Sequence, residues 1–562
     1  MGFTISDFIQ VFLTLAVIVV ATPLLGGYMA KVFQGERTWL SPALRPLEKI
    51  IYKICGIDEF GEMNWKQYSI SLLCFNFLGL IFVMLLMMVQ QILPLNPQGF
   101  TNTSWHLAFN TAVSFMTNTN WQAYSGESTL SYLTQMLGLG VQNFFSAATG
   151  FAVFLAFTRG IARKQVTGIG NFWVDLTRAT VHVLLPLSFF LAVVLVGEGV
   201  VQNFNSYVPA KTLEGAEQIL PQGPAASQIA IKQLGSNGGG FFGVNSAHPY
   251  ENPTPLSNFL QMISLVLIAA ASTYTFGVMV GSRKQGWMLF SAMMAMFVVM
   301  LSLSLWSEYS ANPFIAQAAS MEGKETRFGV TNSVLWSVLT TSASNGSVNA
   351  MHSSLSPLSG GIALVNMMLG EVIFGGVGAG MYGMLLFVIL TVFISGLMVG
   401  RTPEYLGKKI EAKEIIWVMI GVLAPCVVIL IFSALAIATP AGLAGLGHQG
   451  PHGLSEILYA YTSGAANNGS AFGSLSVNTT FYNVTMALAM LVGRFAIILP
   501  VLVIAGSLAN KKIAPASVGT FKTDSLLFVV LLCAIIVIVG ALTFFPALSL
   551  GPILEHFLMM RG

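Results

Sequence analysis

The sequence predicts an all-α integral membrane protein, and three observations lead to this prediction. Only 8% of the 562 residues are charged and 55% are hydrophobic, with a mean hydropathy of +0.75, whereas soluble domains carry about 25% charged residues. The apolar residues gather in runs of about 20, which cross a hydrocarbon core as helices that satisfy their own backbone hydrogen bonds. The short alternating segments of a β-barrel are absent.

Ten membrane-spanning helices can be assigned along the chain. The first has no Lys or Arg before it, so it is predicted to be a retained helix and not a signal segment. The seventh is predicted to be interrupted. The ten spans cover residues 8–29, 68–92, 132–156, 180–201, 257–280, 286–305, 361–399, 415–438, 483–507 and 526–546.

Basic residues concentrate in alternate loops. Most of the 25 Lys and Arg residues follow the first, third, fifth, seventh and ninth spans. Because cytoplasmic loops attract Lys and Arg, both termini are predicted to be extracytoplasmic. The same basic loops are expected to attract anionic lipid head groups. The net charge of +3 is scattered and predicts no nucleic-acid partner.

The outer connections after spans two, four, six and eight share one order, which is a polar stretch, a short apolar helix and a polar tripeptide. The short helices are expected at 104–117, 226–234, 331–341 and 454–462, each too short to cross the membrane. The tripeptides begin 118, 108 and 123 residues apart, which indicates one unit repeated four times. They are Asn118-Thr119-Asn120, Ser236-Asn237-Gly238, Ser344-Asn345-Gly346 and Asn467-Asn468-Gly469.

This repeat divides the chain into four pore units and two additions. The additions are the first helix with its cytoplasmic loop (1–67) and a C-terminal helix (513–562). The pore units are expected at 68–178, 179–284, 285–413 and 414–512.

The four polar tripeptides are predicted to form a filter for a monovalent cation. Non-helical backbone survives at membrane depth only inside protein or beside water, and loops around one axis can present carbonyl oxygens to an ion. Such a loop needs residues at positive φ, which suits Gly at the third position and is tolerated by Asn120. No tripeptide contains the carboxylate expected for a divalent ion. A single loop of this kind would be interpreted as an ordinary outer turn, but four in register favour the filter.

The stretch GEVIFGGVGAGMYG (370–383) interrupts the seventh span. Each Gly costs about 1 kcal/mol in a helix interior, so the stretch is predicted to unwind; close packing of small residues is the alternative. The predicted loop contains an intramembrane acid, which needs a cavity or a partner. Arg494, inside the ninth span, is the expected partner, in a buried pair that either fixes packing or belongs to a gate. The loop residues are Glu371, Gly375, Gly376, Gly378 and Gly380.

The chain is not expected to be an enzyme by itself. No cytosolic loop exceeds about 40 residues, whereas a nucleotide-binding domain needs about 100 or more. The phosphate-binding pattern GxxxxGK[ST] is also absent. Any ATP hydrolysis is therefore predicted to occur in another chain.

Four strings carry a resemblance to a known family: TNTNWQAYSGE (117–127), SNGGGFFGVNSAHPYENPTP (236–255), GEVIFGGVGAGMYG (370–383) and YTSGAANNGSAF (461–472). In a ten-span chain of this length they resemble the KdpA family, the potassium-binding subunits of the bacterial Kdp ATPase. The resemblance implies a potassium-channel-like fold in one polypeptide, K⁺ as the transported ion, and a location in the bacterial inner membrane. It implies as partners a P-type ATPase subunit (KdpB), a single-span subunit (KdpC) and a small subunit (KdpF).

By position, the resemblance makes the twelve tripeptide residues the K⁺ filter. It places Gln122 and Gly238 at positions linked to potassium affinity and selectivity, with Gly239 as further filter support. Asn120 departs from the Gly of the other three copies, so the fourfold set is imperfect.

Three functions are compatible with these features. The first is the ion-selecting subunit of an ATP-driven potassium importer, in which the Glu371 loop diverts the ion toward a partner. The second is a stand-alone potassium channel or ion-gradient-coupled transporter of the same architecture. The third, a secondary transporter with inverted repeats, is disfavoured because all four polar loops lie on one side. The residues alone do not decide between the first two, but the resemblance favours the importer.

Overall fold

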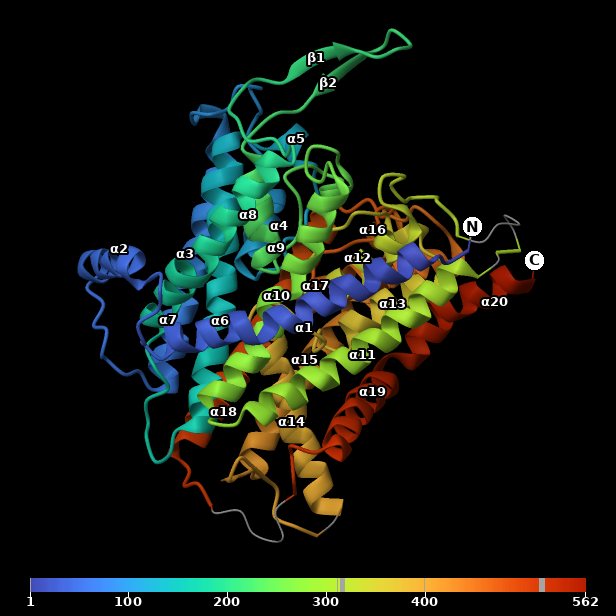
Figure 1. The fold of residues 1–562 in the computed structure, drawn as a ribbon. Helices are drawn as coiled ribbons and strands as arrows, with labels where there is room; N and C mark the ends of the chain where they lie inside the picture. The colour runs from blue at the N-terminus through green and yellow to red at the C-terminus, as the bar shows by residue number, and fades with distance from the viewer. Residues whose placement is uncertain (1, 311, 314–318, 399, 515–520, 562) are drawn as a thin grey trace.

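The computed structural model describes residues 2–310, 312–313, 319–398, 400–514 and 521–561, and within them ten helices are long and apolar enough to cross a membrane. Figure 1 shows them as one bundle, with both chain ends near each other. The spanning helices are α1 (Ile5–Phe33), α3 (Trp65–Val89), α6 (Val141–Ala162), α7 and α8 (Phe172–Arg178, Leu185–Gly197), α10 (Pro255–Met279), α11 (Arg283–Tyr309), α14 (Ala379–Met398), α15 (Ala412–Ala438), α18 (Thr480–Asn510) and α19 (Leu526–Leu548).

Three spans contain a π-helical turn. One precedes α6 (Thr134–Gly140), one joins α7 to α8 (Ala179–Leu184), and one joins α19 to α20 (Ser549–Ile553, Leu554–Arg561). Other short helices include α2 (Ser41–Cys55), α5 (Gly126–Thr129) and α16 (Pro440–Leu443), and 3-10 turns occur at Gln90–Ile92, Asn245–Ala247 and His352–Ser354.

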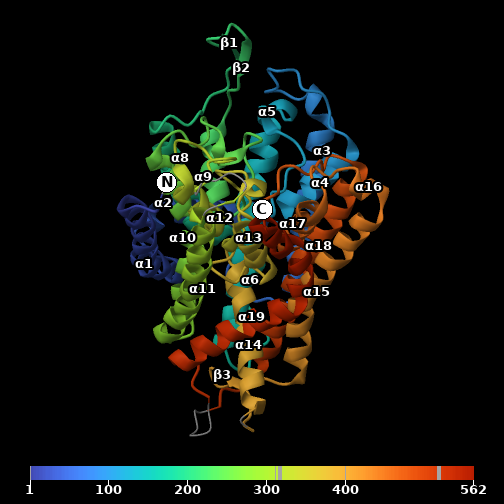
Figure 2. The ribbon, with the colours of Figure 1, turned by 90° about the vertical axis from the view of Figure 1, so that its right-hand side faces the viewer.

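The predicted fourfold repeat is confirmed. Each unit has an outer helix (α3, α7 with α8, α11, α15), a pore helix and an inner helix (α6, α10, α14, α18). The pore helices are α4 (Trp105–Met116), α9 (Ala225–Leu234), α12 (Gly329–Ser342) and α17 (Gly450–Ala466), and Figure 2 shows them at one level in the upper half of the molecule. α17 is longer than expected at both ends. Its Gly464 packs against Met486 of α18, so tertiary contact outweighs the low helix propensity of Gly.

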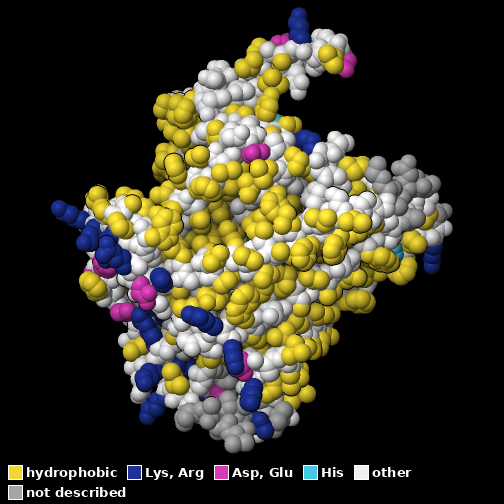
Figure 3. Space-filling model, in the orientation of Figure 1, with side chains coloured by type: hydrophobic (Ala, Val, Ile, Leu, Met, Phe, Trp, Pro, Cys, Tyr) yellow, Lys and Arg dark blue, Asp and Glu magenta, His cyan; other side chains and the backbone are white. Residues whose placement is uncertain are grey.

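Burial separates the inner helices from the outer ones. In the most apolar stretch of each span, 83% of the residues are buried around α6 and 78% in α10, against 17% in α1 and 28% in α15. Hydrophobic side chains cover the side of the bundle, and Lys and Arg gather over α2 and the lower end (Figure 3). The inner helices therefore surround the central axis while the outer helices face lipid.

The seventh span is interrupted as predicted. The helix α13 (Pro357–Met368) ends at the first glycines, and α14 begins at Ala379. Residues 369–378 form a loop between them, with positive φ at Gly370, Glu371, Phe374 and Gly378. Since this backbone is not helical, close packing of small residues within a continuous helix is ruled out as the explanation.

Two small hairpins lie at opposite ends. β1 (Val208–Lys211) pairs antiparallel with β2 (Glu217–Leu220) and projects from the upper end (Figure 1). β3 (Glu404–Tyr405) pairs with β4 (Lys408–Lys409) at the lower end. The buried Lys408 ammonium donates to the Leu508 carbonyl at 2.7 Å, which fastens this lower hairpin to the end of α18.

Candidate functional site

The four tripeptides meet in one closed ring, and we call them the ring segments (118–120, 236–238, 344–346 and 467–469). All of their residues are buried except Gly469, which is half-buried. Each segment bonds to the next, so the ring has no gap. The links are Asn118 Nδ2 to Ser236 O (3.0 Å), Gly346 N to Asn237 O (3.4 Å), Ser344 Oγ to Asn467 O (3.0 Å) and Asn467 Nδ2 to Thr119 Oγ1 (3.0 Å).

Positive φ occurs at the first position of every ring segment. Asn118, Ser236, Ser344 and Asn467 have φ between 48° and 68°. The third position is also left-handed at Asn120, Gly238 and Gly469, but Gly346 is not, so the expectation for the third position was wrong for this copy. A left-handed residue therefore follows each pore helix closely and turns the chain into the ring.

The second-position asparagine side chains of two segments fold back onto their own loops. Asn345 Oδ1 accepts from the Ser347 N–H at 2.9 Å, and Asn468 Oδ1 accepts from the Ser470 N–H at 3.0 Å. Because the amide oxygens are used in this way, the side chains hold the loops and do not fill the ring. The oxygens left for an ion are those of the backbone.

Many of these backbone oxygens have no partner. Within the described chain, seven ring carbonyls accept no hydrogen bond: those of Asn118, Thr119, Asn120, Ser344, Gly346, Asn468 and Gly469. Buried backbone carbonyls are almost always paired, and a dehydrated alkali cation is a suitable partner for a ring of such oxygens. The arrangement can therefore replace the hydration shell of a monovalent cation.

A cavity of about 790 Å³ lies above the ring. Its lining includes Asn120, Gly346 and Gly469 from three ring segments, and Gly239, which directly follows the second ring segment. An ion entering this cavity therefore meets all four repeats at once.

Gln122 and Gly239 brace the contact between the first two repeats. Gln122 donates to the Gly240 carbonyl at 3.0 Å and accepts from the Gly240 N–H at 2.8 Å. A Cβ on Gly239 would lie 3.0 Å from the Asn120 carbonyl oxygen. The two residues thus fix the first ring segment against the second.

A buried ion pair stands behind the second ring segment, and sequence reasoning missed it. Lys232 on α9 pairs with Glu251, and both side chains are fully buried. The Lys232 ammonium also donates to the Gly239 carbonyl at 2.8 Å. The available sequence signal was a lysine in a short, otherwise uncharged helix.

The 369–378 loop crosses directly below the ring. The buried Glu371 carboxylate accepts from Asn468 Nδ2 at 2.8 Å, and a Cβ on Gly376 would lie 3.1 Å from Ser344 Cβ. At its other end Gly378 packs against the backbone of Gly150 on α6. Gly375 and Gly380 touch each other where the chain turns into α14.

Glu371 and Arg494, the expected partners, interact through their charges without a direct salt bridge. Arg494 is buried, and its guanidinium donates to the Ser146 carbonyl at 3.1 Å. The side-chain amide of the fourth ring segment satisfies Glu371, and a backbone carbonyl of α6 binds Arg494. Each buried charge therefore has a dipolar partner, and the loop contacts the ring itself through Glu371.

The sequence matches the family profile KdpA, described as "Potassium-transporting ATPase A subunit", over residues 12–557. It is 56% identical over 555 residues to the "Potassium-transporting ATPase potassium-binding subunit" of Pseudomonas entomophila (strain L48), covering 98% of each chain. It is 58% identical over 565 residues to the protein of that name from Rhodospirillum centenum (strain ATCC 51521 / SW), covering 100% of this chain and 99% of the other.

Among solved structures, the chain resembles the potassium transporter TrkH from Vibrio parahaemolyticus. The TM-score is 0.52 at 14% identity, covering 88% of this chain and 97% of the other. At this identity the likeness establishes a shared fold.

Proposed function

Because this chain belongs to the KdpA family of potassium-transporting ATPase A subunits, we propose that it is the potassium-binding and translocating subunit of an ATP-driven importer. The relatives that match along the full length are named as potassium-binding subunits of such an ATPase. ATP hydrolysis then belongs to a partner, and this chain selects the ion.

The closed ring of buried segments is the observation that carries the proposal. Seven ring carbonyls without partners, in segments that carry no carboxylate, fit a monovalent cation held by neutral dipoles. The ligand set is the twelve ring residues, Asn118 to Asn120, Ser236 to Gly238, Ser344 to Gly346 and Asn467 to Gly469, supported by Gln122 and Gly239. K⁺ enters from the outer cavity and sheds its water at this ring.

The 369–378 loop acts as the gate. It lies under the ring and is tied to the fourth ring segment through the Glu371–Asn468 hydrogen bond. A channel needs a continuous axial path, whereas a loop held across the axis stops free flow and sends the ion sideways. This arrangement supports transfer of K⁺ to a neighbouring subunit.

The assembly contains a KdpB-like P-type ATPase subunit, a KdpC-like single-span subunit and a small KdpF-like subunit. The complex lies in the bacterial inner membrane with both termini of this chain outside. The clustering of Lys and Arg at the lower end of the bundle supports this orientation (Figure 3).

Uptake of K⁺ into sealed vesicles tests the proposal. The chain is purified with and without its co-expressed ATPase partner, and potassium uptake is measured with ATP and with a non-hydrolysable analogue. We expect uptake only with the partner and with ATP. Equal uptake by the chain alone would refute the importer and establish a stand-alone channel or gradient-coupled transporter.

A further inference from the structure

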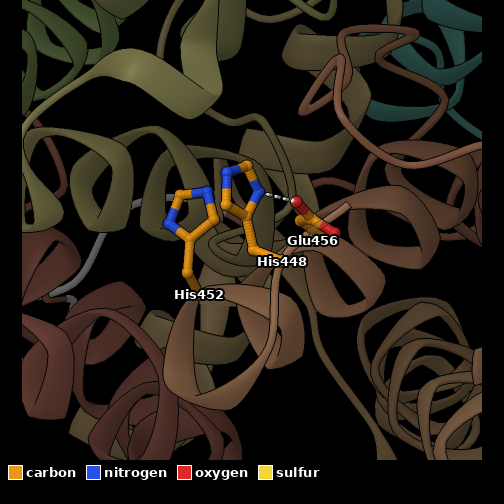
Figure 4. A group of neighbouring side chains, drawn as sticks. All are labelled: His448, His452 and Glu456. Carbon is orange, nitrogen blue, oxygen red and sulfur yellow. Dashed lines mark hydrogen bonds and ion pairs between the residues drawn. The ribbon is translucent and has the colours of Figure 1, made fainter. Parts of the chain in front are cut away.

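A cluster of histidine and carboxylate side chains lies on the outer side, away from the ring. His448 precedes α17, and His452 and Glu456 lie on its first turns, at intervals of four residues. One ligand atom from each of the three lies within 4.8 Å of the others. Figure 4 shows the two imidazoles side by side and His448 bonded to Glu456.

The donor set suits a divalent transition metal. Two imidazoles and one carboxylate are a known set for Zn²⁺, which binds nitrogen and oxygen at about 2.0–2.2 Å. Ligands in such a tetrahedron lie about 3.4 Å apart, by simple geometry from those bond lengths, so the side chains must close in slightly. The His448 side chain is 55% exposed and free to make this movement.

The surroundings of the cluster already provide orienting contacts. Glu555 on α20 accepts from His452 Nδ1 at 2.8 Å, which leaves Nε2 of that imidazole available. A carboxylate on the second ring nitrogen is the usual partner of a metal-binding histidine. Glu456 is held in turn by the Gly447 N–H at 3.0 Å and the Ser474 hydroxyl at 2.6 Å.

A short chain of contacts connects this cluster to the fourth ring segment. The His452 ring stacks on Phe472 at 5.6 Å between centroids, and Phe472 stacks on Tyr459 at 4.3 Å. The Tyr459 hydroxyl bonds to Ser470 Oγ at 2.8 Å, and the Ser470 N–H bonds to Asn468 at 3.0 Å. These contacts would therefore transmit a movement of His452 toward Glu456 to Asn468 of the fourth ring segment.

From this geometry we propose that His448, His452 and Glu456 bind a divalent transition-metal ion such as Zn²⁺, and that its binding weakens K⁺ binding at the fourth ring segment. Drawing His452 onto the metal shifts its ring on Phe472 and loosens the contacts that hold Asn468. Glu555 acts as a positioning residue through His452. The metal site is independent of the proposed function, whereas the effect on K⁺ rests on it.

Metal binding is tested first, without any transport assay. The complete complex, freed of any histidine tag, is dialysed against Zn²⁺, and bound metal is counted; Co²⁺ absorption reports the ligand geometry. We expect one ion per chain in the unmodified protein, loss of that ion in His448→Ala and His452→Ala, and about tenfold or more weaker binding in Glu555→Gln. Equal binding by the His448→Ala variant would overturn the site.

The matched control is His106→Ala. His106 lies at the outer end of pore helix α4 and bonds to Asn483, so it repeats the setting of the cluster without the other ligands. The control should bind Zn²⁺ as the unmodified protein does, and loss of the ion in this control would also overturn the site. An unchanged elution profile on size exclusion confirms that each variant is folded.

The effect on K⁺ is tested by uptake with and without Zn²⁺. Zn²⁺ should raise the K⁺ concentration for half-maximal uptake in the unmodified complex and in His106→Ala, but not in His448→Ala. If Zn²⁺ binds and the half-saturation is unchanged, the coupling to the ring is wrong although the site is real. Failure of K⁺ uptake without Zn²⁺ would instead contradict the proposed function, so the two failures are distinguishable.

Discussion

Replacing Gly238 with Ala is the sharpest test of the ring. Gly238 has φ of +87°, and an added Cβ would run into the backbone of Gly346 and lie 2.6 Å from the Ser347 N atom. The neighbour is backbone of the third ring segment, which cannot move aside as a flexible side chain could. The substitution therefore changes the second segment and the third together.

The size of the effect follows from two costs. A left-handed backbone costs an L-residue about 1–2 kcal/mol, and overpacking costs about 1–3 kcal/mol. Together they amount to about 2–5 kcal/mol. The calculation takes this cost to fall on the conformation of the ring that binds K⁺. At about 1.4 kcal/mol for each factor of ten, we expect K⁺ affinity to fall by about 30-fold or more.

The assay is ATP-dependent uptake by the complex in vesicles, with K⁺ half-saturation and discrimination against Rb⁺ and Na⁺ as readouts. Gly99→Ala is the control, because Gly99 has φ of +67° and an added Cβ would meet nothing within 4 Å. The control carries the backbone strain without the collision and should keep normal K⁺ affinity. Unchanged affinity and selectivity in Gly238→Ala would refute the assignment of the ring.

Three further substitutions test the elements around the ring. Glu371→Gln changes the buried carboxyl group that accepts from Asn468 into an amide, which perturbs a hydrogen bond of about 0.5–1.5 kcal/mol. Maximal uptake should therefore fall more than K⁺ affinity. A loss confined to affinity would place Glu371 in the binding site. Lys232→Met leaves Glu251 buried without its partner, at a cost of about 3–5 kcal/mol. The melting temperature should therefore drop, and it should partly recover when Glu251→Gln is added. An unchanged melting temperature in Lys232→Met would contradict a stabilising role for the ion pair. Gly378→Ala places a Cβ against the Gly150 backbone, so we expect ATP-independent K⁺ leak into vesicles, and tight vesicles would argue against the gate.

Periodicity and repetition made much of the fold predictable. The apolar runs gave the ten spans, and the four short helices before polar tripeptides gave the pore repeats. The break in the seventh span followed from the helix cost of its glycines and from the acid that lies among them. These features depend on local properties of the chain, which a sequence displays directly.

The details of the candidate site depend on contacts between distant residues. Ser236 and Ser344 adopt positive φ, although serine has no strong preference for it. The pore helix that ends before each of them, and the neighbouring segment that bonds to it, impose this backbone. Arg494 and Glu371 were expected to form an ion pair because both are buried charges. Instead, Glu371 accepts a hydrogen bond from a side-chain amide and Arg494 donates one to a backbone carbonyl. Sequence shows that a buried charge needs a partner without showing which one.

The four ring segments belong to a single polypeptide, and this has a consequence for how the ring can vary. In an assembly of identical subunits, every substitution alters four equivalent positions simultaneously. Here each quarter can change alone, so one quarter carries Glu371 beneath it and another carries the Lys232–Glu251 pair. Because the four units are covalently joined, the pore need not be fourfold symmetric, and an exit can open on one side only.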